Sequence, residues 1–210
     1  MRRIIVLGIF LLAVSFAFAE TSAGVVVTYT PLEGDYQTVL YNGSTLTDNL
    51  TFELLGFKAF VDFTYVEASI GLDTSVGNLN ESATYLGVSG SQNFPWSVTI
   101  LNIRLIGKYP FKLGSGALYP LVGLEKYFCL SGSESNVSFT SDEISDASPW
   151  WLMVGFGGDT NIAPKIYLRA ETTVAYNLTS ERSSSYYTGT TYQSSSGWEI
   201  QVAFGIGFFL

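Results

Sequence analysis

Large apolar residues recur at every second position along this chain, and this alternation constrains the fold more than any other feature. The C-terminal segment 196–210 shows it most clearly. One set of alternate positions holds Trp198, Ile200, Val202, Phe204, Ile206 and Phe208. The positions between them hold Gly197, Glu199, Gln201, Ala203, Gly205 and Gly207. Because successive side chains of a β-strand point to opposite faces, the segment is predicted to be a strand with one apolar face and one small or polar face.

Seven further segments share this period, and their spacing predicts the topology. Strands are predicted at 24–31, 50–62, 65–73, 96–109, 118–130, 148–159, 166–178 and 196–210. Short connections lie at 63–64, 110–117 and 160–165, whereas the polar stretches 32–49, 74–95, 131–147 and 179–195 are predicted to be long loops. Alternating short and long connections predict an all-β, antiparallel, up-and-down meander, with four long loops at one end and both termini at the other.

The composition of the chain indicates whether lipid or water surrounds this meander. Hydrophobic residues make up 47% of the chain and charged residues 13%, yet after the N-terminus no run approaches the roughly 18 apolar residues of a transmembrane helix. A soluble lipocalin-like barrel would place its apolar residues inside. The small and charged residues on the opposite parity suit a narrow lumen instead. We therefore predict an eight-stranded transmembrane β-barrel over residues 20–210.

The N-terminus predicts export. Arg2 and Arg3 precede an apolar run, 4–18, and Ala17–Phe18–Ala19 fits the small-x-small cleavage pattern of a signal peptide over residues 1–19. An uncleaved anchor is the alternative, but the run is short and no basic residue follows it directly. The predicted address is the bacterial outer membrane, reached after export through the inner membrane.

Charged residues on the lumen parity form the first candidate site. The predicted lumen network comprises Lys58, Glu67, Arg104, Glu125, Arg169, Glu171 and Glu199. Unpaired charges in a narrow interior are costly, so these residues should pair. They form either a salt-bridged plug or a gate and proton path, and the small bore of eight strands favours the plug. Glu125 and Lys126 are adjacent, so one of them must face outward, near a rim where it can snorkel.

Aromatic residues at the strand ends predict two girdles at the lipid–water boundaries. The loop-side girdle is predicted to contain Trp96, Trp150, Trp151 and Trp198. The turn-side girdle is predicted to contain Tyr65, Tyr109, Tyr119 and Tyr167.

These features resemble the small outer-membrane barrels typified by the OmpA membrane domain, OmpX and the Opa adhesins. Val202, Phe204, Ile206, Phe208 and Leu210 resemble the C-terminal signal by which such proteins reach the barrel-assembly machinery, although that family usually ends in phenylalanine. The segment from Gly107 to Glu125 is similar to hairpins of spirochaete barrels. The resemblance implies outer-membrane lipid, periplasmic chaperones and the assembly machinery as partners, and a monomer.

Missing residue types exclude several functions. The chain has no histidine, on which the barrel enzymes of this resemblance depend, so it is predicted not to be an enzyme. Cys129 is the only cysteine, which disfavours zinc and excludes an intrachain disulfide. No cofactor is predicted, and Asp142–Glu143 is interpreted as a solvated loop face rather than a calcium site. A net charge of −8 argues against nucleic-acid binding.

Two functions stay open. The segment 179–195 is rich in Tyr, Ser, Thr and Gly, the residues that binding loops favour. This favours a structural, adhesin or ligand-binding barrel with surface-exposed loops and a plugged lumen. The alternative is a porin-like small channel or a conduit for hydrophobic solutes, similar to OmpW.

Overall fold

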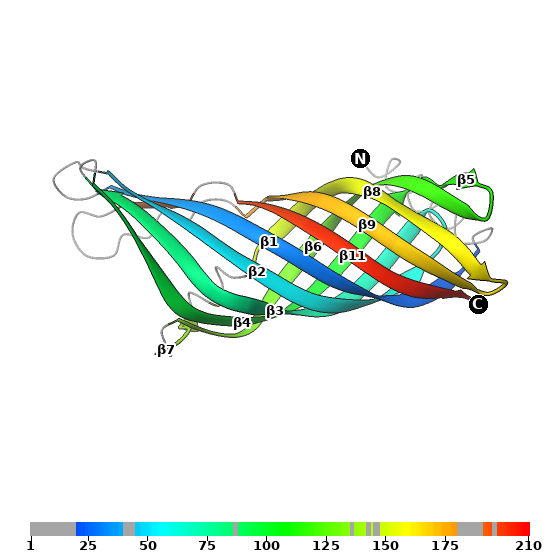
Figure 1. Cartoon of the computed structure of the whole chain (residues 1–210), viewed down its shortest axis with the longest axis horizontal. Coiled ribbons are helices and arrows are strands. Elements are labelled where there is room, and N and C mark those ends of the chain that lie inside the picture. Colours follow the sequence, from blue (N-terminus) through cyan, green and yellow to red (C-terminus); the bar gives the residue numbers. More distant parts are fainter. Residues whose placement is uncertain are drawn as a thin grey trace, which may run out of the picture.

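Eight long antiparallel strands form a closed barrel (Figure 1). A computed structural model describes residues 20–39, 45–85, 88–134, 137–141, 144, 148–179, 191–194 and 197–210. Within these residues the long strands are β1 (Ser22–Val39), β2 (Thr45–Asp62), β3 (Val66–Tyr85), β4 (Val88–Lys108), β6 (Gly116–Glu134), β8 (Trp150–Ala163), β9 (Ile166–Asn177) and β11 (Trp198–Phe209). Each pairs with the next along the chain, and β11 pairs with β1 to close the sheet. The predicted up-and-down barrel is confirmed.

Three short strands complete the sheet. β5 (Phe111–Leu113) and β7 (Val137–Ser138) pair with β6, and β10 (Thr191–Ser194) pairs with β1. No helix in the described part of the chain is long and apolar enough to cross a membrane. The predicted signal peptide and Asp142–Glu143 lie outside the described residues.

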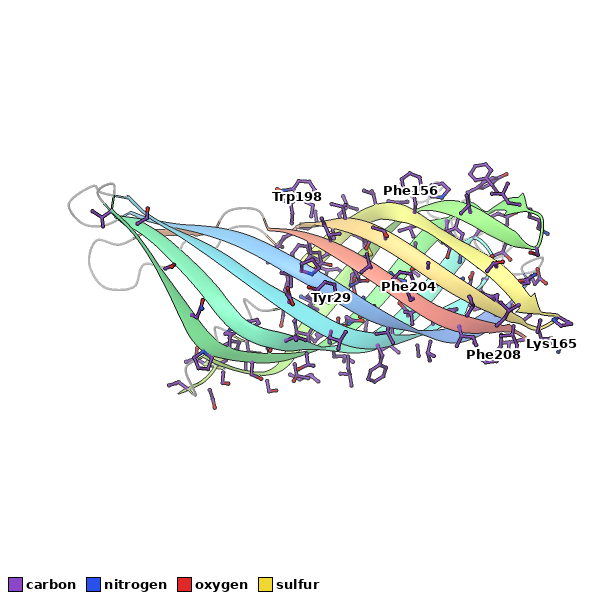
Figure 2. The ribbon with its side chains drawn as sticks, viewed as in Figure 1. Tyr29, Phe156, Lys165, Trp198, Phe204 and Phe208 are labelled. Atoms are coloured by element: carbon purple, nitrogen blue, oxygen red, sulfur yellow. The ribbon has the colours of Figure 1, made fainter. Side chains whose placement is uncertain are left out.

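The outer face of the barrel is apolar. Phe156, Phe204 and Phe208 point away from the wall in Figure 2, and Phe204 is 65% exposed. The outward set continues around the barrel with Val25, Val27, Leu55, Phe57, Ile70, Leu72, Ile103, Leu105, Val122, Leu124, Leu152, Val154, Leu168, Val174 and Ile200. A continuous apolar surface of this extent is unfavourable in water and favourable in lipid. The C-terminal pattern lies on this face, where Phe204, Phe208 and Leu210 are exposed and Val202 and Ile206 are half-exposed.

The two ends of the barrel differ. One end carries the short turns, with Thr64 and Gly114 in left-handed backbone conformations at φ 66° and 61°. The last residue lies beside the start of β1 there, because the Leu210 backbone N–H donates to the carbonyl oxygen of Thr21, the residue before β1, at 3.0 Å. We call this the turn end, and it carries the start of β1 and the C-terminus, as predicted.

At the opposite end, β1 to β4 continue well past the barrel, and the predicted loops 32–49 and 74–95 are therefore wrong in large part. β1 and β2 stay paired out to Val39 and Thr45, and β3 and β4 stay paired out to Tyr85 and Val88. β10 adds to the outer part of β1. We call these outer segments (33–39, 45–52, 77–85, 88–95 and β10) the projecting sheet, which tapers to the left in Figure 1. The polarity of these stretches reflects water around the strands, since backbone pairing does not require apolar side chains.

Irregular pairing marks the boundary between barrel and projecting sheet. The β2–β3 register shifts between Thr51 and Glu53, and the β4–β6 register shifts at Thr99. Between β3 and β4 the side chains of Thr74 and Ser75 hydrogen-bond to the backbone of Val98. Bulges bend strands and increase their twist, so this belt re-aims β2 to β4 as they leave the barrel.

Glycines on the lumen side make room for aromatic rings on the neighbouring strand. Tyr119 lies over Gly157, Tyr167 over Gly207 and Phe60 over Gly24, and each couple is also a register pair. An added Cβ at Gly157 would lie 2.3 Å from the Tyr119 ring. Glycine in the wall therefore lets large rings occupy a bore that eight strands leave narrow.

This arrangement predicts that Gly157→Ala destabilises the barrel. The new methyl must displace the Tyr119 ring, and overpacking of this kind costs about 1–3 kcal/mol. Urea unfolding in lipid vesicles measures the free energy of unfolding. Gly107→Ala is the control, because its Cβ would come no closer than 3.8 Å to the Val122 carbonyl oxygen. Equal stability of the two variants would contradict the ring-over-glycine packing.

Candidate functional site in the barrel lumen

Two arginines hold a charge layer near the turn end of the lumen. Arg104 on β4 donates to Glu67 at 2.9 Å and to Glu171 at 2.8 Å. Arg169 on β9 donates to Glu67 and Asp62. Every charged side chain in this layer is nearly or fully buried. Carboxylates from β2, β3 and β9 thus bridge arginines from β4 and β9 across the bore.

Lys108 and two tyrosines complete this layer. The Lys108 Nζ lies 2.5 Å from Asp62 Oδ2, 3.5 Å from Glu67 Oε2 and 4.4 Å from the centre of the Tyr119 ring. The Tyr119 hydroxyl donates to Glu171 at 3.0 Å. Arg169 lies over the rings of Phe60 and Tyr167 as well. The guanidinium and ammonium groups are therefore held by both carboxylates and ring faces.

A second charged layer lies farther from the turns. The Lys58 Nζ donates to Glu125, and both side chains are 0% exposed. Lys58 also donates to Gln201 Oε1 at 3.0 Å, and Gln201 Nε2 donates to Thr30 at 3.2 Å. The pair and its partners thus connect β1, β2, β6 and β11 inside the barrel.

Two further buried carboxyls are held by uncharged donors. Asp73 accepts hydrogen bonds from Thr28 at 2.9 Å and from Asn102 at 2.5 Å. Glu199 accepts from the Tyr127 hydroxyl at 2.9 and 3.0 Å. Neither has a salt-bridge partner among the described residues, so they leave the lumen with an excess of acidic groups.

An apolar cluster lies inside the barrel beyond the charged layers, and alternation alone did not reveal it. Its buried members are Leu32, Leu54, Val98, Ile100, Tyr127, Cys129, Trp151, Met153 and Ala175, with Trp96, Phe139 and Ile144 packed against them. Phe139 comes from the connection after β7, and its ring centre lies 6.2 Å from that of Trp96. We call this cluster the apolar plug.

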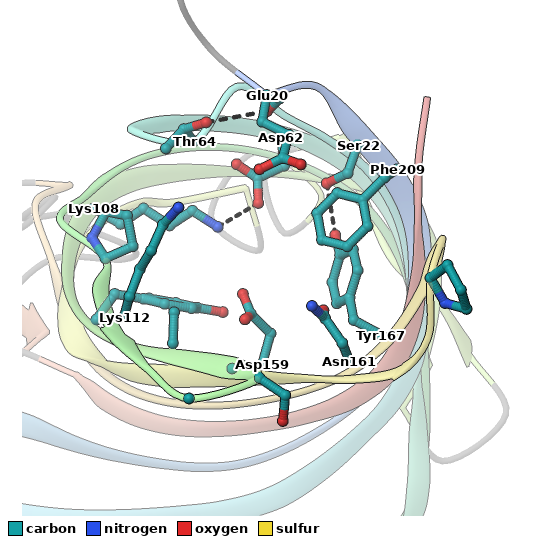
Figure 3. A pocket seen from close by; sticks show the side chains of 17 residues that line it. Glu20, Ser22, Asp62, Thr64, Lys108, Lys112, Asp159, Asn161, Tyr167 and Phe209 are labelled. Atoms are coloured by element: carbon teal, nitrogen blue, oxygen red, sulfur yellow. Dashed lines mark hydrogen bonds and ion pairs between the residues drawn. The ribbon is translucent and has the colours of Figure 1, made fainter.

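The turn end opens into a cavity of about 330 Å³, seen end-on in Figure 3. Asp62, Lys108 and Tyr119 of the charge layer line it, together with Asp159 and Asn161 near the end of β8. The Ser22 and Tyr167 hydroxyls, 2.7 Å apart, lie on its wall. We call this space the mouth cavity.

The structure places all seven residues of the predicted lumen network inside the barrel. Glu67, Arg104, Arg169 and Glu171 meet in the first layer, Lys58 and Glu125 meet in the second, and Glu199 lies apart with Tyr127. The prediction missed Asp62, Asp73 and Lys108. Their positions could have revealed them, because side chains an even number of residues apart on a strand point to the same face. Asp62 is four residues from Lys58, Asp73 is six from Glu67, and Lys108 is four from Arg104.

The prediction of two aromatic girdles was partly wrong. Tyr65, Tyr109, Trp150 and Trp198 are exposed on the outer face. Tyr119 and Tyr167 are 1% exposed and Trp151 is 4% exposed, because each shares parity with inward residues of its strand. Trp96 is half-buried against the apolar plug. Lys126 is the outward member of its pair with Glu125, with its Nζ over the rings of Phe128 and Trp150 and bonded to the Ser148 carbonyl oxygen.

The predicted binding loop 179–195 lies largely outside the described residues. Only Thr179 and β10 are described, and Thr179 Oγ1 accepts the Trp150 backbone N–H at 2.8 Å. No group of three or more His, Cys, Asp or Glu side chains in the described ranges is placed to hold a metal ion.

The whole arrangement is that of an outer-membrane protein. An even number of strands, an apolar outer face, aromatic residues at its boundaries, a polar lumen and short turns at one end are the shared features of bacterial outer-membrane barrels. This chain combines all of them, and it is an integral β-barrel of the outer membrane.

Comparison with known proteins gives no family. No protein-family model and no curated protein matches the chain. Among solved structures it is similar to Neisserial surface protein A, with 10% identity over 90% of this chain and 99% of that chain and a TM-score of 0.48. It is also similar to the outer-membrane protein OprG from Pseudomonas aeruginosa, with 14% identity over 91% of this chain and 98% of that chain and a TM-score of 0.47. A third similar structure is the attachment invasion locus protein Ail of Yersinia pestis in complex with a heparin analogue, with 12% identity over 89% of this chain and 99% of that chain and a TM-score of 0.30. The strand order of this chain, and not these likenesses, establishes its architecture.

The second layer predicts strong coupling between Lys58 and Glu125. Lys58→Met leaves a buried carboxylate unpaired and should lower the free energy of unfolding by about 3–5 kcal/mol. The double variant Lys58→Met/Glu125→Leu removes both charges and should recover most of that loss. Urea unfolding of both variants measures this coupling. A double variant no more stable than Lys58→Met would show that the two residues act independently.

Proposed function

We propose that this protein is an outer-membrane barrel closed to solutes, which presents the projecting sheet outside the cell as a binding surface for an extracellular ligand. The observation that carries the proposal is the contrast between the two parts of one sheet. Inside the membrane, side chains from all sides meet across the bore. Beyond it, β1 to β4 continue for many residues of regular pairing although no lipid demands it.

Three successive obstacles support a closed lumen. The charge layer of Arg104 and Arg169 crosses the bore first, the Lys58–Glu125 pair follows, and the apolar plug comes last. An ion passing this route must break charge-assisted hydrogen bonds that are shielded from water. It must then cross an apolar segment, where it would lose its hydration without compensation.

The projecting sheet is suited to recognition because its strands are paired in a defined register. Strands hold binding residues more precisely than loops do. The segments 33–52 and 77–97 contain four acidic residues, Glu33, Asp35, Asp48 and Glu81, and no lysine or arginine. The proposal takes residues 1–19 as a cleaved signal peptide and the barrel as a monomer inserted by the assembly machinery.

A small channel is the second candidate, and the mouth cavity favours it. This cavity opens at the turn end and reaches the charge layer at Asp62 and Lys108. Rearrangement of the charge layer and of the apolar plug would be needed to extend it through the barrel. An enzymatic role has no support in the residue content, since the chain lacks histidine.

Planar-bilayer recording distinguishes the closed barrel from the channel. The purified protein is expected to show no steady single-channel conductance in the nanosiemens range. The double variant Arg104→Ser/Arg169→Ser provides the comparison, because it removes both bridging cations of the charge layer. Steady nanosiemens conductance of the unaltered protein would refute the closed lumen.

Trimming the projecting sheet tests its role. Tyr36 faces Asp48 and Glu81 faces Gln92 in the register. Replacing residues 37–47 and 82–91 by Asn-Gly turns should leave a folded barrel, since two-residue turns close antiparallel hairpins. Binding to arrays of immobilised glycans and extracellular-matrix proteins should be lost in the trimmed variant, while heat-modifiable gel migration persists. Unchanged binding by the trimmed barrel would rule out the projecting sheet as the binding surface.

A further inference from the structure

The mouth cavity has the features of a ligand site in its own right. It encloses about 330 Å³, at the lower end of the roughly 300–1,000 Å³ typical of small-molecule sites. Its inner wall is the charge layer, whose side chains are fixed by ion pairs from several strands. Figure 3 shows polar side chains converging on the space, with Asp159 on one side and Asp62 and Lys108 opposite.

The charges around this space do not balance. Three carboxyls, Glu20, Asp62 and Asp159, and two lysines, Lys108 and Lys112, line the cavity. Lys108 is paired with Asp62. The lining therefore holds one more carboxyl than lysines, and a carboxylate without a cation at the open end favours a positively charged occupant.

Asp159 is the carboxylate best placed to meet such an occupant. It is half-buried, its side chain points into the mouth cavity, and the backbone N–H of Ala117 is its hydrogen-bond donor. No salt bridge joins it to a cation among the described residues. Across the cavity, Asp62 uses Oδ2 for Lys108 and Arg169, while its buried Oδ1 atom has no hydrogen-bond partner.

These groups select among cations. A metal ion would need three or more ligating side chains, and the described residues offer no such group. An ammonium or guanidinium group needs fewer carboxylates around it than a metal ion does, because each of its N–H groups can donate to a separate oxygen, charged or neutral. Asp159 and the Asn161 amide oxygen supply separate acceptors, and Tyr119, Tyr167 and Phe209 supply an aromatic wall.

We propose that the mouth cavity binds a small organic cation that carries a primary ammonium or guanidinium group, with Asp159 as its main acceptor. The cation is either a free small amine or the side chain of a lysine or arginine from a periplasmic peptide, since both present the same group. This site faces the turn end, opposite the projecting sheet. It goes beyond the proposed function, which neither requires it nor fails with it.

Titration of the whole protein in lipid nanodiscs tests the site. The side-chain amide signal of Asn161 in nitrogen-15 spectra is followed while ethylammonium or ethylguanidinium chloride replaces sodium chloride at constant ionic strength. A saturable shift is expected, and Asp159→Asn should weaken the affinity at least tenfold. Asp159→Glu keeps the charge and should retain binding. Lysine-containing and arginine-containing tripeptides, titrated in the same way, distinguish a peptide side chain from a free amine as the preferred form.

Two controls separate recognition from general charge effects. Glu53→Gln also removes one negative charge, but from the outer face near the projecting sheet, and should bind like the unaltered protein. Tetraethylammonium has the same charge without N–H donors and should bind at least tenfold more weakly. Heat-modifiable migration verifies that each variant is folded. The absence of a saturable shift, or equal affinity in folded Asp159→Asn, would overturn the proposal.

Discussion

Satisfaction of the backbone hydrogen bonds in lipid is the constraint on which the rest of this structure depends. A sheet edge cannot be left unpaired in hydrocarbon, so the strands must close on themselves, and here β11 closes against β1 from Ser22–Phe209 to Glu33–Trp198. Closure with eight strands sets a narrow bore. The wall then separates two solvents, and the period-two alternation along each strand sorts side chains between lipid and lumen.

The narrow bore explains why the lumen is organised in layers. Charged side chains from opposite walls come within ion-pair distance, so Arg104 reaches Glu67 and Glu171 on different strands. Glycines such as Gly157 leave space for rings such as Tyr119, whose hydroxyl then joins the charge layer. Burying so many charges is costly unless each finds partners. Asp73 and Glu199 have uncharged hydrogen-bond donors in place of cations, and Asp159 lies where the lumen meets water.

Outside the lipid the constraint is relaxed, and the same strands behave differently. The projecting sheet need not close, its residues need not alternate, and register shifts near Thr51 and Thr99 accompany the change of direction. Water can satisfy backbone groups that are left exposed there. The result is a barrel with buried side chains inside it and a projecting sheet that continues beyond it.

The sequence by itself determined the strands, their order and the inward parity of Lys58, Arg104 and Arg169, because period-two alternation is a local property of the chain. It also excluded histidine-dependent chemistry. It did not reveal the length of β1 to β4 outside the barrel, since polar strands and polar loops have similar composition. Nor did it separate inward Tyr119, Tyr167 and Trp151 from outward Trp150 and Trp198. Only the tertiary structure decided which charges pair, where the apolar plug lies and that Asp159 faces a cavity, because strand stagger sets the height of each residue in the bore.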